Sequence, residues 1–100
     1  MSEEREYIEI TISDILEEYL EDTGLSQNGL ARELGVPPTR INQIMLNKRS
    51  ITADTDLRLC KFFNKTDGFF LRLQDNLELR KTKQKIEKEL DAIVPYKRYA

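Results

Sequence analysis

The spacing of small and apolar residues across residues 25–52 constrains the fold of this chain more than any other feature. Two helices joined by a tight turn need a small residue where their backbones approach, and a residue that tolerates a left-handed conformation where the first helix ends. Ala31 and Gly35 meet these two needs, and Ile41 and Ile44 give the second helix an apolar face. The segment therefore predicts a helix-turn-helix unit.

Both helices of this unit have clear start signals. Ser26 is a favoured N-cap for the first helix, which Gly35 can end. Pro37 and Pro38 lack the backbone N–H that a helix leaves unpaired in its first turn, so they can open the second helix. We expect that second helix at about residues 38–46.

The outer side of the second helix carries side chains that can read DNA bases, because Ile41, Ile44 and Met45 should face inward. Arg can bridge the O6 and N7 acceptors of guanine, Asn and Gln can pair with adenine, and Thr can touch a thymine methyl. Lys48 and Arg49 follow where a DNA backbone would pass, which suits phosphate contact. The candidate DNA-binding residues are Gln27, Thr39, Arg40, Asn42, Gln43, Asn47, Lys48 and Arg49.

The alternative is that these polar residues form only the solvated face of an inert helical hairpin, with Lys48 and Arg49 as a solvated loop pair. For any single residue that alternative is preferred, since Arg, Asn and Gln are common on protein surfaces. For the whole set we favour DNA binding, because its members fall where a recognition helix meets the major groove.

The remaining apolar periodicity predicts an all-α chain of five helices. A first helix is expected at about residues 13–22 and a fourth at about residues 53–64, the latter capped by Thr52 and closed by Asn64. The residues of the fourth helix that should pack beneath the helix-turn-helix unit are Leu57, Leu59, Cys60, Phe62 and Phe63. A fifth, long helix is expected at about residues 67–91, capped by Thr66 with Asp67 in its first turn.

The two ends of the chain should differ from this helical body. Ile8, Ile10 and Ile12 alternate with polar residues, the period of an extended segment, so residues 1–12 are expected to form an acidic and possibly extended arm. The helix-turn-helix domain would then span residues 13–94. Pro95 would end the last helix, so residues 95–100 would form a flexible tail.

The chain resembles the Xre/Cro-type repressor domain and, more narrowly, the HigA-type antitoxins of toxin–antitoxin modules. The resemblance covers about residues 12–80 and is carried by the runs RIN, NKRSITADT and FLRLQ. It implies a five-helix, lambda-repressor-like DNA-binding domain, with DNA-facing positions at Thr39, Arg40, Asn42, Gln43, Lys48 and Arg49. It also implies a second partner, a small basic toxin that resembles RelE-type messenger-RNA ribonucleases.

Two of the departures from the family pattern concern the first helix and the turn after the recognition helix. The run Thr11-Ile12-Ser13 stands where the family usually has His-Pro-Gly, so no role of that histidine carries over. Asn47 replaces the usual glycine after the recognition helix, and asparagine also tolerates the left-handed conformation. The expected turn geometry is therefore retained at Asn47.

Charge is distributed unevenly along the chain. Residues 1–24 hold nine acidic residues against the single Arg5, a net charge of −8, which leaves +6 for the remainder because the whole chain carries −2. The acidic part should lie away from DNA, where it could attract a basic toxin. A solvated helix face is an equally good explanation of the acidic residues.

The second half of the long helix is too polar to be buried alone, yet it keeps a thin stripe that includes Leu79, Ile86 and Leu90. Such a stripe needs a partner, so we expect the helix to take part in a homodimer, the alternative being a frayed tail. A dimer would place two recognition helices in successive major grooves of double-stranded operator DNA.

Composition argues against an enzyme. Histidine and tryptophan are absent, and Cys60 is the only cysteine, flanked by apolar residues that indicate a core position. No zinc spacing, phosphate loop or catalytic triad can be assembled, so we expect no cofactor, metal or catalytic residue. No signal sequence or membrane span is evident, which favours a cytoplasmic protein.

These observations lead to one expected function and two alternatives. We expect an antitoxin that represses its own operon and neutralises a RelE-like toxin. The first alternative is a stand-alone Cro-like repressor without a toxin partner. The second is a protein-interaction module that has kept the motif but lost DNA affinity.

Overall fold

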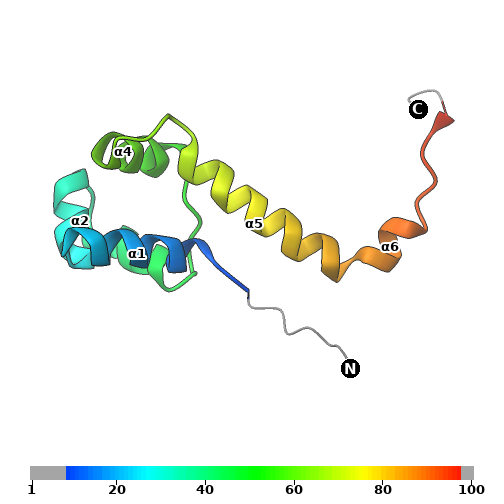
Figure 1. Ribbon diagram of the computed structural model, residues 1–100, viewed down its shortest axis with the longest axis horizontal. Helices are drawn as coiled ribbons and strands as arrows, with labels where there is room; N and C mark the ends of the chain where they lie inside the picture. The colour runs from blue at the N-terminus through cyan, green and yellow to red at the C-terminus, as the bar shows by residue number, and fades with distance from the viewer. Residues whose placement is uncertain (1–8, 98–100) are drawn as a thin grey trace.

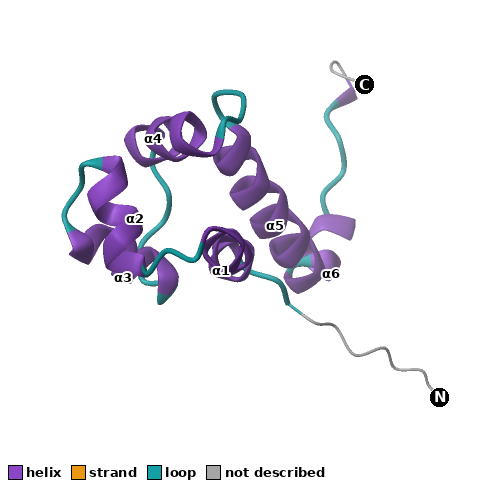
Figure 2. Cartoon of the chain, turned by 60° about the vertical axis from the view of Figure 1, so that its left-hand side comes forward, coloured by secondary structure: helices purple, strands orange, loops and turns teal. Residues whose placement is uncertain are grey.

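The computed structural model describes residues 9–97, and every regular element within that range is a helix. The helices are α1 (Ile12–Thr23), α2 (Gln27–Leu34), α3 (Pro38–Met45), α4 (Ala53–Phe63), α5 (Phe69–Lys85) and α6 (Glu87–Asp91). Helices α1 to α4 form a compact cluster, and α5 leads away from it to α6 (Figure 1). The all-α architecture is confirmed. In Figure 2, α2 and α3 lie against each other as the predicted helix-turn-helix unit.

The chain enters α1 through a capping box, so the helix begins at Ile12, one residue earlier than expected, and Ile12 is not part of an extended segment. The N–H of Asp14 donates to Thr11 Oγ1 at 3.4 Å, and Asp14 Oδ2 accepts from the N–H of Thr11 at 2.9 Å. These reciprocal bonds hold the first turn of the helix. Ile12 is consequently helical and buried, whereas Ile10 is half exposed; Ile8 lies outside the described residues.

The turns around α2, α3 and α4 follow the sequence signals closely. The N–H of Gly29 donates to Ser26 Oγ at 2.9 Å, and Gly35 ends α2 with a φ of 72°. Asn64 ends α4 in the same left-handed conformation, with a φ of 62°. Thr52 occupies the N-cap position of α4, but its hydroxyl makes no capping hydrogen bond there.

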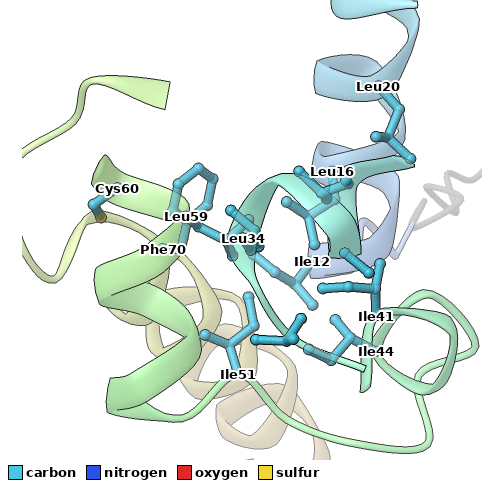
Figure 3. Close-up of a cluster of buried hydrophobic side chains, with 13 residues drawn as sticks. Ile12, Leu16, Leu20, Leu34, Ile41, Ile44, Ile51, Leu59, Cys60 and Phe70 are labelled. Atoms are coloured by element: carbon cyan, nitrogen blue, oxygen red, sulfur yellow. The ribbon is translucent and has the colours of Figure 1, made fainter. Parts of the chain in front are cut away.

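The core lies between helices α1 to α5, each of which contributes buried apolar side chains to it. Figure 3 shows Leu16 and Leu34 pointing toward Ile41 from their separate helices. Phe70 is fully buried, and its ring meets that of Tyr19 edge-on at a centroid distance of 5.4 Å. Cys60 is buried, as its apolar flanks predict.

Two residues of α4 were wrongly expected beneath the helix-turn-helix unit. Leu57 is 48% exposed and Phe62 is 37% exposed. Asp56 and Thr55 take the buried positions on this helix with Leu59 and Cys60. The buried face of α4 therefore differs from the face that its apolar residues alone would predict.

A buried aspartate on α4 caps α5, and this corrects the predicted cap at Thr66. Asp56 Oδ2 accepts from the N–H of Gly68 at 2.7 Å, and Oδ1 accepts from those of Phe70 at 2.9 Å and Leu71 at 3.0 Å. These are N–H groups that the first turn of a helix leaves unpaired. The helix accordingly starts at Phe69, and Asp67 lies before it.

The long C-terminal helix is interrupted, so the predicted single helix over about residues 67–91 is wrong. Ile86 has φ −113° and ψ 27°, values that end α5 at Lys85, and the chain resumes as the short α6. The projecting α5 and α6 give the molecule a radius of gyration of 17.4 Å. A compact chain of this length would have about 13 Å.

Candidate nucleic-acid interface

Helix α3 presents a polar outer side because its apolar residues are anchored inside. Pro37 occupies the N-cap position and Pro38 the first helical turn. Ile41 and Ile44 are each 1% exposed, packed in the core between α1 and α2. Because Thr39 and Gln43 lie on the opposite side, their side chains are exposed to solvent. This is the arrangement that base contacts in a major groove require.

The turn after α3 extends this polar side toward two cationic residues. Asn47 has a φ of 60°, as its position in the motif predicts. The N–H of Asn47 donates to Ile44 O at 3.0 Å, and that of Lys48 donates to Gln43 O at 2.9 Å. Lys48 and Arg49 then follow, both exposed, in the position expected for phosphate contacts.

Gln74 of α5 holds the loop that carries these two cations. Its Oε1 accepts from the N–H of Ile51 at 2.7 Å, and its Nε2 donates to Ile51 O at 3.0 Å. Ile51 itself is buried at 2% exposure. One side chain on α5 therefore fixes the backbone just beyond Lys48 and Arg49.

A groove of about 580 Å³ lies beside this loop. It runs between the loop, the segment before α1 and the middle of α5. Lys48 and Arg49 line one side, and Arg80 and Lys81 of α5 line the other. The two pairs of cations are far apart in the sequence, and the fold brings them to one groove.

Two of the candidate amide side chains bond to each other. Asn42 Nδ2 donates to Gln27 Oε1 at 2.8 Å, and both residues are half-buried. This bond joins the start of α2 to the middle of α3. It fixes the orientation of both amides on the polar side of the helix-turn-helix unit.

Arg40 is also bonded within the protein. Its Nη1 lies 2.7 Å from Asp54 Oδ1, in the first turn of α4, and the same oxygen accepts from Arg58 Nε at 2.8 Å. Arg58 Nη1 in turn donates to Leu34 O at 2.8 Å and Gly35 O at 3.3 Å. A chain of polar contacts thus links the end of α2, the start of α4 and the start of α3.

The two arginines lower the pKa of the Asp54 carboxyl below its ordinary value. The hydrogen bond from Arg58 is the largest cause, and the hydrogen bond from Arg40 is the second. Asp54 is therefore a carboxylate at neutral pH, and the three side chains together keep one positive charge. Asp54 and Arg58 were not among the residues predicted from the sequence: their i, i+4 spacing is a recognisable signal, but the contact with Arg40 spans fourteen residues.

The described part of the chain offers no other obvious site. Within residues 9–97, no helix is long and apolar enough to cross a bilayer, and no three His, Cys, Asp or Glu side chains gather so as to hold a metal ion. The polar side of α3 and the loop after it are the surface to which the sequence pattern and the structure both point.

The profile of the helix-turn-helix family (HTH_3) matches residues 16–70, more than half of the chain and all of the α2–α3 unit. The chain belongs to this family. Virulence-associated protein I of Dichelobacter nodosus is 40% identical over 79 residues, which are 79% of this chain and 72% of that protein. A helix-turn-helix family is a binding family rather than an enzyme family, which agrees with the composition.

Solved structures place this helix-turn-helix protein among the HigA-type antitoxins. An addiction-module antidote protein of the HigA family from Coxiella burnetii is 40% identical, covers 88% of this chain and 98% of its own, and has a TM-score of 0.78. The antitoxin HigA of Pseudomonas aeruginosa, solved with the higBA promoter, is 30% identical with the same coverage and a TM-score of 0.78. The resemblance seen in the sequence is confirmed.

Proposed function

We propose that this protein is a DNA-binding antitoxin that represses its own operon in the cytoplasm. One observation carries the proposal: Thr39 and Gln43 are exposed on the outer side of α3, and the turn that follows this helix exposes Asn47, Lys48 and Arg49. Such a surface matches a recognition helix that enters the major groove while the following loop meets the backbone. The HigA relative that was solved with its promoter supports DNA binding.

The candidate residues divide into two roles. Thr39, Arg40, Asn42 and Gln43 would contact base edges, with Gln27 holding the Asn42 amide in place. Lys48 and Arg49 would contact phosphates, and the turn at Asn47 aims them. The base contacts would set the sequence preference, while the phosphate contacts would supply most of the salt-dependent affinity.

We further propose that the protein works as a homodimer through α5 and α6. Leu79 of α5 is 66% exposed, Leu90 of α6 is 40% exposed and Ile93, just beyond α6, is 65% exposed, in the part of the chain that projects from the core (Figure 1). A second copy packed on these residues would remove this apolar surface from water. Two recognition helices about 34–36 Å apart would then fit a palindromic operator.

The acidic side of α1 supports a second partner, a small basic toxin of the RelE-like ribonuclease type. Glu17, Glu18, Glu21 and Asp22 are all exposed on this helix, whose last turn holds no basic residue. Complementary charge raises the rate at which a basic protein finds such a surface. In the proposed antitoxin, DNA and toxin would occupy different surfaces of one fold.

A titration on the region upstream of the gene tests the DNA proposal. The full chain is added to a labelled fragment of that region, and binding is followed by fluorescence anisotropy at several salt concentrations. Tight binding that prefers this fragment over a shuffled one, and that weakens steeply with salt, is expected. Equal and weak binding to both fragments would favour a protein-interaction module that has lost DNA affinity.

Co-expression with the neighbouring gene tests the toxin proposal separately. We expect a small basic protein to co-purify with this chain, and its ribonuclease activity to be blocked in the complex. Operator binding without any co-purifying partner would contradict the antitoxin role and leave a stand-alone Cro-like repressor. Sedimentation of the free protein, with Leu79→Asp as the dimer-breaking variant, tests the homodimer.

A further inference from the structure

Asp54 lies outside the helix-turn-helix unit, yet it contacts the recognition helix directly. We propose that Asp54 is a specificity-determining residue, which holds the guanidinium of Arg40 in one orientation for a base contact and keeps it from binding phosphates indiscriminately. The proposal rests on the proposed function, in which the outer side of α3 meets DNA.

The carboxylate of Asp54 is itself held in place. Asp54 Oδ1 accepts from Arg40 Nη1 at 2.7 Å and from Arg58 Nε at 2.8 Å. Arg58 is anchored on the backbone at the end of α2, 2.8 Å from Leu34 O. Asp54 therefore cannot simply follow a moving Arg40 side chain, because a second arginine ties it to the turn between α2 and α3.

Arg40 keeps N–H donors available for DNA while Asp54 holds its guanidinium. A guanidinium has five N–H donors in a planar fork, and the contact with Asp54 uses one Nη atom. The Arg40 side chain remains 26% exposed on α3. A guanine can accept from this fork at O6 and N7, and a fork that is already oriented loses less side-chain entropy on binding.

The charge of Asp54 should also affect binding to DNA that lacks the operator sequence. Binding to such DNA is driven by cations that meet phosphates and release counterions. The Asp54 carboxylate beside Arg40 offsets that cation and repels an approaching phosphate. A guanine edge carries no net charge, so the same carboxylate opposes the base contact much less. Asp54 should thus favour operator DNA over other DNA.

The test compares two DNA fragments by anisotropy, one upstream fragment protected by the protein and one shuffled fragment of the same composition. We expect Asp54→Asn to weaken operator binding by about three- to tenfold, the range for leaving one arginine side chain unordered before binding. Binding to the shuffled fragment should stay equal or tighten. Asp67→Asn, the same change at an exposed residue in the segment before α5, is the matched control and should not lower the ratio of the two affinities.

Two further variants test whether the effect passes through Arg40. In an Arg40→Gln background, Asp54→Asn should have no further effect on operator binding, because the side chain that it orients is gone. Arg40→Lys keeps the charge but loses the fork, so it should lose preference for the operator while it retains binding to the shuffled fragment. Arg40→Lys leaves the Asp54 side chain in place, so it keeps the idea testable even if Asp54→Asn unfolds the protein.

Three results would overturn the inference. One is an Asp54→Asn variant that shifts the affinities for both fragments equally, leaving their ratio the same as in the Asp67→Asn control. Another is an undiminished Asp54→Asn effect in the Arg40→Gln background. A wild-type protein that does not prefer the upstream fragment would overturn the proposed function, and this inference with it, whereas the first two results leave the proposed function intact.

Discussion

The carboxylate of Asp56, on α4, accepts a hydrogen bond from the backbone N–H of Phe70, on α5, at 2.9 Å. Both residues are buried, at 1% and 0% exposure. The contact joins the helix beneath the DNA-facing unit to the helix that projects from it. A buried side chain of α4 therefore helps to fix the direction in which α5 leaves the core.

Asp56→Ala should destabilise the protein by about 3 kcal/mol, since it leaves the first N–H groups of α5 without their charged acceptor. Asp56→Asn keeps one carbonyl oxygen and should cost less. Urea unfolding followed by circular dichroism measures both. Asp75→Ala, an exposed change on α5, is the control and should remain within about 0.5 kcal/mol of wild type.

Phe70→Ala should cost about 3–5 kcal/mol in unfolding free energy, because the ring is fully buried and contacts Tyr19 and Phe63. Phe62→Ala, on the neighbouring helix, should cost far less, since that ring is 37% exposed. Thermal or urea unfolding measures the loss of unfolding free energy in each of the two variants. Similar losses for both variants would contradict the burial pattern of α4 and α5.

Arg40 and Lys48 should behave differently in DNA binding. Arg40→Gln is expected to lower operator affinity by about 10- to 100-fold and to relax sequence preference. Lys48→Ala should weaken binding to operator and shuffled DNA alike and reduce the salt slope by about one. Anisotropy titrations over a salt series distinguish them. A uniform loss for Arg40→Gln would make that residue a phosphate contact instead.

Gln74→Leu should weaken binding to all DNA about three- to tenfold, because the loop that carries Lys48 and Arg49 loses its anchor on α5 and must be ordered on binding. Helix content should be unchanged by circular dichroism. Gln84→Leu, which lines the same groove, is the matched control. Wild-type affinity of the Gln74→Leu variant would show that the anchor does not affect the DNA contact.

The pKa of Asp54 should rise when either arginine is removed, and more for Arg58→Gln than for Arg40→Gln, because Arg58 is the larger cause of its lowering. A folded-state pKa below the unfolded one means that the ion pairs add stability above about pH 4, and that this contribution is lost as pH falls through the folded pKa. A carboxyl carbon NMR titration measures the shift. An unchanged pKa in both variants would contradict the bonding pattern.

Local signals in the sequence were enough to predict the helix-turn-helix unit. Ser26 acts through its hydroxyl on the next turn, and Gly35 and the Pro37-Pro38 pair act through their own backbones, so neighbouring residues suffice to define where α2 starts and ends and where α3 starts. The inward side of α3 follows from the spacing of Ile41 and Ile44 alone. The left-handed turn at Asn47 was predictable for the same reason.

Local signals misled where two explanations competed within a few residues. The alternation of Ile10 and Ile12 indicated an extended segment, but the capping box of Thr11 and Asp14 places Ile12 in a helix. The hydroxyl of Thr66 indicated a helix cap, but a carboxylate from another helix supplies it. A buried charged acceptor binds the free N–H groups more strongly than a local hydroxyl does.

The sequence by itself determined the family, the helix-turn-helix unit and the set of polar residues on its outer side, because these depend on periodicity and on backbone preferences of adjacent residues. Only the tertiary structure decided which of those side chains are already engaged. Arg40 meets Asp54, Asn42 meets Gln27 and Gln74 meets Ile51 across at least fourteen residues of chain. Such contacts form only when separate helices pack together, so no pattern within one helix reveals them.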